Sequence, residues 1–330
     1  MRRCLIILDG FMERKLENKS FKELLLNDLD ISYSESYKDF SIIGKDIDSL
    51  NCIMNILGIN SSKINIGERS FYEGLNKGIF INDNQTILRC NIVKIRNGVL
   101  EDFTGGDLPN NIGEILKEIE IENGKLYPCF KYKNLLVLDE KVDFKLYPPH
   151  FNIGKDINCI MPKDSNIKSI VDKSYDFFKA QDLEGLILWP WGASNSIDLD
   201  IKKENTGMIA GIDLVCGIGK ALGMKVIQPV NTNGDSDTDL NNKFRAFLEI
   251  IKEVDNLVIH INGFDELSHR KDFNGKLKFI DKVREEFILP LLNYMERYKY
   301  KISITCDHRT DSFTGNHEKG LVPYLEISNI

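Results

Sequence analysis

Residues 257–269 read LVIHINGFDELSH, a short apolar run followed by a polar segment rich in acids and ending in histidine. A run of this length, dominated by β-branched and other apolar residues and closed by a turn, predicts a buried strand. Similar runs alternate with stretches of helical spacing through the C-terminal half of the chain. This alternation predicts an α/β sheet with helices on both faces.

The middle of the chain differs from this pattern. It combines β-like pieces at 86–95 and 135–138 with Gly-Gly, Pro-Pro and Asn-Gly turns and one amphipathic helix near 112–119. We therefore expect a smaller α+β domain at 82–182, inserted into a larger domain made of 1–81 and 183–330. The strands expected in the larger domain are 4–8, 185–189, 225–227, 257–261 and 301–305. The helices expected there are 51–57, 208–222, 240–253 and 277–298.

Composition narrows the classes of function. The 330 residues are 42 % apolar and 28 % charged, and 43 basic against 50 acidic residues give a net charge of −7. An acidic chain without a basic block argues against nucleic acid or an anionic membrane as partner. No apolar run approaches the roughly 20 residues of a spanning helix, and the apolar stretch at 4–8 is too short for a signal-peptide core. The seven scattered cysteines, none with CxxC spacing, are typical of reduced thiols in a cytoplasmic protein and exclude a disulfide scaffold.

Acids and histidines follow three of the expected strands. Because ligands bind outside the carboxyl ends of strands in an open α/β sheet, these side chains can converge. Carboxylate and imidazole without thiolate suit Mn, Zn or Fe, and six such groups are enough for two ions. The candidates are Asp9, Asp265, His269, Asp307, His308 and His317.

Taken singly, each candidate has an ordinary structural explanation. An Asp after a strand is usually a turn residue or a helix cap, and a lone His is usually a satisfied polar side chain. Three of the five histidines beside acids after strand ends argue against that explanation as a group. His150 and His260 lack this context and are left out of the predicted site.

The segments LDG at 8–10, FDELSH at 264–269 with a following Lys276, and CDHRTDSFTGNHEKGLVPYL at 306–325 form a recognisable series. Together they resemble the alkaline phosphatase superfamily, and more narrowly its archaeal-type 2,3-bisphosphoglycerate-independent phosphoglycerate mutases. Softer matches, such as RCNIVKIRNGVLEDFTGG at 89–106, extend the resemblance over nearly the full length in the same order. The resemblance implies an alkaline-phosphatase-like sheet and a metal-dependent phosphoglycerate-mutase-like phosphotransferase, classed as an isomerase.

The resemblance also implies roles for single residues. Asp265, His269 and His317 would hold one divalent ion, Mn or Zn. Asp9, Asp307 and His308 would hold the second, together with the nucleophilic hydroxyl. Counting back from ILGIN at 56–60 assigns that hydroxyl to Ser49, just ahead of an expected helix where N–H groups and the helix dipole favour a phosphate. On propensity alone, Ser49 would instead be a helix N-cap.

Departures from the family concern the substrate pocket. The Asp and His that follow the family's serine are Leu50 and Ile53 here, and no arginine occurs between Arg96 and Arg245. The family's mutases use arginines of the inserted domain to bind phosphoglycerate, since Arg contacts carboxylate or phosphate in a bidentate way. The substrate-contacting cations that remain as candidates are Arg89, Lys133 and Lys243. The metal chemistry is therefore better supported than specificity for 3-phosphoglycerate.

Several functions stay open. A phosphoserine enzyme acting on a small phosphorylated metabolite could be a mutase, a phosphomonoesterase or a phosphotransferase similar to homoserine kinases. A degenerate, non-catalytic binding protein on the same fold is the alternative from another class. Gly217, Gly219 and Gly223 loosely resemble a nucleotide-binding loop, but they lie inside an expected helix rather than at a strand–helix turn.

Overall fold

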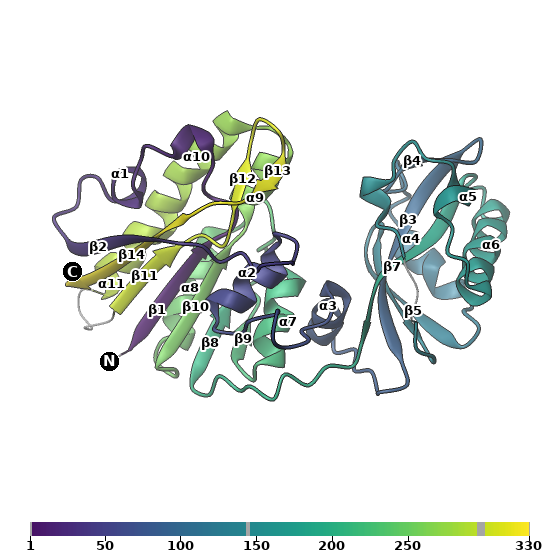
Figure 1. The fold of residues 1–330 in the computed structure, drawn as a ribbon, viewed down its shortest axis with the longest axis horizontal. Helices are drawn as coiled ribbons and strands as arrows, with labels where there is room; N and C mark the ends of the chain where they lie inside the picture. Colours follow the sequence, from purple (N-terminus) through teal and green to yellow (C-terminus); the bar gives the residue numbers. More distant parts are fainter. Residues whose placement is uncertain (1, 143–145, 296–300, 330) are drawn as a thin grey trace. The chain divides into compact units, whose positions relative to one another are not determined.

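The computed structural model describes residues 2–142, 146–295 and 301–329. It contains two compact units, shown as a ribbon in Figure 1. The first unit combines Met1–Ile66 with Leu199–Ile330, and the second is Gly67–Asp198. The second unit is thus one continuous segment, whereas the first is made of two separate stretches of the chain. Among the described residues, none of the helices combines the length and the apolar character that crossing a bilayer requires.

The first unit contains a seven-stranded mixed sheet. In spatial order its strands are β2 (Ser32–Lys38), β14 (Val322–Asn329), β11 (Lys301–Thr305), β1 (Arg3–Leu8), β10 (Asn256–Ile261), β8 (Thr206–Ile209) and β9 (Lys225–Ile227). The five strands from β11 to β9 are parallel, whereas β14 and β2 pair antiparallel at one edge.

Helices cover both faces of this sheet. They are α1 (Phe21–Leu25), α2 (Ser49–Ile56), α7 (Asp213–Ala221), α8 (Leu240–Ile250), α9 (Gly263–His269), α10 (Phe273–Val283) and α11 (Leu289–Met295). In β1, Cys4, Ile6 and Leu8 pack into a core shared with α8, α10 and α11. Ile7, which points to the opposite face, is also fully buried. Burial on both faces explains why the central strands are continuous apolar runs.

The second unit is an α+β domain built on an antiparallel sheet. Its strands are β3 (Thr86–Arg96), β4 (Val99–Asp102), β5 (Gly124–Phe130), β6 (Lys133–Leu138) and β7 (Leu186–Asn195). Its helices are α3 (Arg69–Asn76), α4 (Ile112–Ile115), α5 (Ile157–Ile160) and α6 (Ser165–Ala180). The long strand β3 pairs with β6 and β4 along one edge and with β7 along the other.

The fold class expected from the sequence is confirmed, with differences in the boundaries. The second unit begins before and ends beyond the expected insert of 82–182. One reason is α3, whose Ser70 hydroxyl donates to the carbonyls of Ile87 in β3 and Gly192 in β7. The other is β7, which pairs with β3 and so belongs to the insert rather than to the larger sheet.

Two expected helices also differ from the structure. The stretch expected as helix 208–222 begins as the strand β8, and α7 starts only at Asp213. The stretch expected as one helix at 277–298 covers the end of α10, which begins earlier at Phe273, then a π-helical turn at Arg284–Ile288 and α11. Residues 296–298 lie outside the described residues.

Candidate functional site

The carboxyl ends of three neighbouring parallel strands carry most of the predicted site. Asp9 follows β1, Asp265 and His269 lie on α9 directly after β10, and Asp307 with His308 follows β11. Since β10, β1 and β11 are adjacent, their ends meet at one edge of the sheet, as expected for an α/β fold. His317 joins them from β13 (Asn316–Glu318), the second strand of a hairpin with β12 (Arg309–Asp311).

Asp9, Asp307 and His308 form the first group of potential ligands, and all three are buried. The Nε2 atom of His308 lies 3.4 Å from Asp9 Oδ1 and 3.3 Å from Asp307 Oδ2. The backbone N–H of Gly10 donates to Asp307 Oδ1, which ties the two strand ends together. Five of the six predicted Asp and His residues form two overlapping groups that share His308. The sixth, His269, joins the cluster through contacts with Asp265 and His317.

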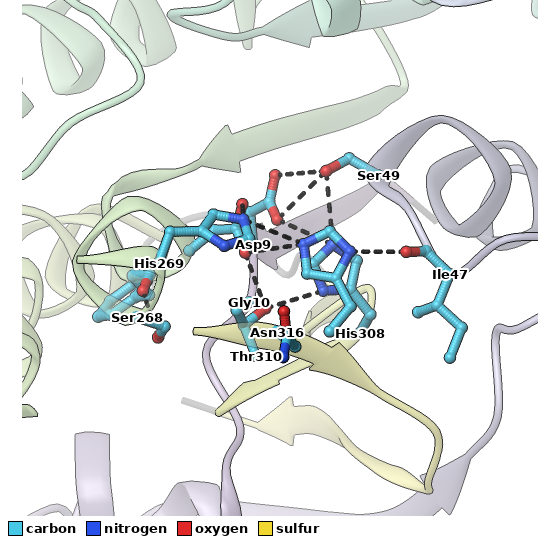
Figure 2. A network of polar contacts seen from close by, with 12 residues as sticks. Asp9, Gly10, Ile47, Ser49, Ser268, His269, His308, Thr310 and Asn316 are labelled. Carbon is cyan, nitrogen blue, oxygen red and sulfur yellow. Dashed lines mark hydrogen bonds and ion pairs between the residues drawn. The ribbon is translucent and has the colours of Figure 1, made fainter. Parts of the chain in front are cut away.

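Ser49 lies beside the first group, at the start of α2 (Figure 2). Its hydroxyl is 3.3 Å from Asp9 Oδ2 and 3.4 Å from His308 Nε2. Asp48, not Ser49, is the N-cap, because the Asp48 carboxylate accepts the N–H of Asn51 at 2.7 Å. The interpretation of Ser49 as a simple cap is therefore wrong, and its buried hydroxyl faces the carboxylate and imidazole groups instead.

Asp265, His269 and His317 meet on the other side of His308. Asp265 Oδ2 lies 3.2 Å from His269 Nε2, and Asp265 Oδ1 lies 3.3 Å from His317 Nε2. The Nε2 atoms of the two histidines are themselves 3.2 Å apart. Asp265, His308 and His317 make up the second group of atoms close enough to share one ion.

Hydrogen bonds at Nδ1 orient all three imidazoles. His269 Nδ1 donates to the carbonyl of Gly315 at 2.8 Å, and His317 Nδ1 donates to that of Ile47 at 2.6 Å. The Thr310 hydroxyl donates its proton to Asp265 Oδ1 at 2.7 Å. Because that proton is used, the Thr310 hydroxyl oxygen must accept the proton of His308 Nδ1, which lies 3.1 Å away. A proton on each Nδ1 leaves each neutral ring with a lone pair on Nε2, aimed into the cluster.

The electrostatics of the cluster fit a divalent cation. Burial and the neighbouring carboxylates of Asp307 and Asp265 raise the pKa of Asp9 well above its usual range. Burial lowers the pKa of His308, which keeps Nε2 unprotonated. Asp307 Oδ2, facing that lone pair, is buried and accepts no hydrogen bond from the described residues. An unpaired carboxylate oxygen opposite a ring lone pair is an arrangement that a bound cation would satisfy.

The second group shows the same need for positive charge. Burial opposes ionisation of Asp265, but hydrogen bonds from His269 and His317 hold the pKa of this carboxyl well below its usual range. The hydrogen bond to Asp265 in turn raises the pKa of His269 to about 9. Two Nε2 atoms at hydrogen-bond distance need a proton or a metal ion between them, and at neutral pH a proton on His269 fulfils this role.

A family model described as 2,3-bisphosphoglycerate-independent phosphoglycerate mutase matches residues 43–183. A protein of that name from Methanothrix thermoacetophila is 26 % identical over 304 residues, covering 85 % of this chain and 76 % of the relative. The chain resembles the 2,3-bisphosphoglycerate-independent phosphoglycerate mutases. The resemblance to these mutases inferred from the sequence motifs is confirmed.

Solved structures agree with this mutase-like fold. A structure of the PH0037 protein from Pyrococcus horikoshii superposes with a TM-score of 0.74 at 20 % identity, covering 99 % of this chain and 87 % of that one. The cofactor-independent phosphoglycerate mutase of Thermoplasma acidophilum gives a TM-score of 0.55 at 16 % identity, covering 99 % and 89 %. At these identities the likeness concerns the fold.

A further histidine, which was not among the predicted ligands, contacts this cluster of acids and histidines. His260 in β10 is buried, and its Nε2 lies 3.0 Å from Asp9 Oδ2. Burial lowers the pKa of His260 to about 3, so the neutral ring donates to the carboxylate. The available signal was an imidazole inside an otherwise apolar strand, in register with Ile7 near the end of β1.

The three cations predicted to contact substrate have different surroundings. Lys243 on α8 is 1 % exposed, and its ammonium donates to the backbone carbonyl of His260 at 3.0 Å, so it is buried behind β10. Arg89, in the second unit, is 3.0 Å from the carboxylate of Glu73 and lies over the ring of Trp191. Lys133, in the same unit, lies 5.5 Å from the ring centre of Tyr132. The prediction for Lys243 is wrong because its nitrogen faces backbone.

Proposed function

We propose that the chain is a metal-dependent phosphoryl-transfer enzyme of phosphoglycerate-mutase type, acting through a phosphoserine at Ser49. The observation that carries the proposal is the position of the Ser49 hydroxyl, buried at the start of α2 and within 3.5 Å of both Asp9 and His308. A hydroxyl in this setting is an activated nucleophile rather than a surface group. The similarity to named mutases over most of the chain supports the same activity.

The residues that would hold two divalent ions follow from the clusters. Asp265, His269 and His317 would bind one ion. Asp9, Asp307 and His308 would bind the other, beside Ser49. Three imidazoles with Nε2 facing inward and a buried carboxylate oxygen without a donor support this assignment, and the ligand types suit Mn or Zn. When bound, such ions supply positive charge beside the transferring phosphoryl group and favour the ionised form of the serine.

Residues of the chain itself direct the reaction. Ser49 Oγ would form a bond to phosphorus as the bond to the substrate oxygen breaks, and the N–H groups at the start of α2 would bind phosphoryl oxygens. In the second half-reaction the phosphoryl group leaves Ser49. Return to another hydroxyl of the same substrate makes the enzyme a mutase, whereas transfer to water makes it a phosphatase.

The second unit would serve as a substrate-binding or lid domain, and its charges favour a second candidate function. Arg89, a predicted contact for an acidic substrate, is neutralised by Glu73. Since Lys243 is buried elsewhere, fewer cations remain for the two anionic groups of phosphoglycerate. A phosphomonoesterase acting on a less acidic metabolite is therefore the second candidate. A cytoplasmic location is supported by seven free cysteines, five of them buried.

One assay separates these functions. Metal-stripped protein is supplied with Mn²⁺ and 3-phosphoglycerate or another phosphomonoester, and the isomerised product and free phosphate are followed in the same samples. We expect metal-dependent turnover, with isomer formation for a mutase and phosphate release for a phosphatase. Absence of both, with Mn²⁺ bound, would favour the non-catalytic binding protein.

A further inference from the structure

Lys276 on α10 is a fully buried lysine next to the ligand cluster. Its ammonium donates to the carbonyl of Gly10 at 2.8 Å, the hydroxyl of Ser268 at 2.8 Å and the carbonyl of Thr310 at 3.2 Å. An ammonium has three N–H donors, so all of them are used. A buried group with every donor paired to a separate acceptor has a defined position.

The three acceptors lie on three different ligand-carrying segments. Gly10 directly follows Asp9 at the end of β1, Ser268 directly precedes His269 on α9, and Thr310 stands two residues after His308. These segments are also packed tightly against one another. A Cβ atom at Gly10, whose φ is +63°, would lie 2.7 Å from Asp265 Oδ1. Small shifts between the segments would therefore move the ligands of both groups.

Glu13 is the counter-ion of this lysine. Its Oε2 lies 3.1 Å from Lys276 Nζ, and both side chains are fully buried. Its Oε1 accepts the hydroxyl proton of Ser312 at 2.9 Å. Because the pair is neutral as a whole, it adds no net charge to the cluster. Buried ion pairs can often be replaced by apolar residues without loss of stability, so the contacts of this pair, rather than its charge, point to its role.

We infer that Lys276 is a positioning residue that fixes the spacing of the three ligand-carrying segments, with Glu13 as its buried counter-ion. The inference rests on the proposed metal-dependent function, since it concerns ligands of that same site. Lys276 contacts none of the predicted ligand atoms of the cluster in the described structure. It acts through the backbone of Gly10 and Thr310 and the side chain of Ser268.

The test measures Mn²⁺ affinity of the metal-stripped full chain by calorimetry, together with hydrogen exchange of the metal-free protein. The variants are Lys276→Met and the double variant Glu13→Gln/Lys276→Met, which avoids an unpaired buried carboxylate if the single variant folds poorly. Lys22→Met is the matched control. Lys22 also donates to three backbone carbonyls, those of Leu26, Asn27 and Leu29, but none lies in a ligand-carrying segment.

We expect the Lys276 variants to bind Mn²⁺ about 10–100-fold more weakly, the range found when groups that orient metal ligands are lost. Exchange should accelerate together in 8–12, 264–270 and 307–312. Lys22→Met should lower the melting temperature but change neither the Mn²⁺ affinity nor the hydrogen exchange of these three segments. Unchanged affinity in the double variant, or faster exchange in only one segment, would overturn the inference.

The outcome also separates this inference from the proposed function. A wild-type protein that binds Mn²⁺ but transfers no phosphoryl group contradicts the function, and the affinity and exchange readings then still decide the role of Lys276. A wild-type protein that binds no divalent ion overturns both.

Discussion

The hydroxyl of Ser49 lies 3.4 Å from the Nε2 atom of His308, a residue 259 positions further along the chain. The contact is possible because α2 begins next to the carboxyl ends of β1 and β11, where His308 follows the strand. Since His308 Nδ1 is bonded to Thr310, the ring presents its Nε2 lone pair to the serine. A hydroxyl and an imidazole that lie far apart in the sequence thus share one buried site.

Ser49→Ala should abolish turnover and covalent labelling. Protein incubated with a phosphorylated substrate and Mn²⁺, then quenched in acid, should carry a phosphate on the peptide containing Ser49, detected by mass spectrometry. Because Asp48 provides the helix cap, the substitution should cost little stability. A fully active, unlabelled Ser49→Ala protein would remove the phosphoserine mechanism.

Ser61→Ala is the control for this experiment. Ser61 is also buried, and its hydroxyl donates to Asn51 Oδ1 at 2.8 Å on the same helix. We expect normal labelling and a loss of about 1 kcal/mol in the free energy of unfolding, the usual value of one hydrogen bond. A label on Ser61 or Ser41 in the wild type would keep the mechanism and correct the residue.

Asp307→Ala and His269→Ala should each remove activity by weakening metal binding, while the fold is kept. Asp307 belongs to the first group and His269 contacts Asp265 in the second, so the two variants test the two proposed ions separately. Metal content after dialysis, measured by mass spectrometry, should fall in each variant. The control is His150→Ala, a histidine of the second unit outside the cluster. Metal-independent activity of the wild type would contradict the two-metal proposal.

The order of strands and helices could be predicted because the parallel strands of the first unit are short apolar runs. For three other strands, the sequence pattern either did not indicate a strand or assigned the strand to the wrong sheet. The last two residues of β8, Met208 and Ile209, are as apolar as the helix that follows, so periodicity merged them with α7. Almost every residue of β2 is exposed, which removes the hydrophobic alternation. The pairing of β7 with β3 depends on partners far apart in sequence, which local patterns do not encode.

The candidate site was predictable to the extent that ligands follow strand ends. Asp9, Asp265 and Asp307 obey that rule. His260 does not, because it lies inside β10 and contacts Asp9 only through the parallel register of β10 with β1. Lys243 was misassigned because sequence shows the residue type but not the direction of a side chain on a buried helix face.

His260→Phe should weaken metal binding, whereas His260→Gln should largely retain it. The neutral imidazole of His260 donates to Asp9 Oδ2 at 3.0 Å and so orients that carboxylate. Glutamine keeps an N–H donor, while phenylalanine has none and leaves the buried oxygen unpaired. We expect about a tenfold or larger loss of Mn²⁺ affinity for the Phe variant, measured by calorimetry. Equal affinities in the two variants would show that the donor is not what matters.

Lys243→Met should change how stability depends on pH above neutrality. Burial lowers the pKa of Lys243 to about 8, below the value of the unfolded chain. Between about pH 8 and 10.5 the unfolded state therefore binds more protons at this residue, so its contribution to the free energy of unfolding rises with pH. In Met this contribution is absent. Denaturant unfolding across that range should show a more positive slope for the wild type, and identical slopes would contradict a depressed pKa.

Turnover of 3-phosphoglycerate should be weak compared with that of a phosphomonoester lacking a carboxylate. A substrate with two anionic groups needs donors for each, and bidentate arginines are the strongest. In the second unit, the charge of Arg89 is already paired with Glu73 at 3.0 Å. The measurement compares kcat/KM for both substrates at the same Mn²⁺ concentration.

Glu73→Gln sharpens this comparison. Removing the carboxylate frees the guanidinium of Arg89, so any participation of Arg89 in substrate binding should raise kcat/KM for 3-phosphoglycerate more than for the monoester. Arg89→Met is the complementary variant, because it removes the guanidinium altogether. It should lower turnover of 3-phosphoglycerate more than turnover of the monoester. Efficient wild-type isomerisation at micromolar 3-phosphoglycerate would show that lysines and backbone N–H groups suffice, and the argument from missing arginines would then fail.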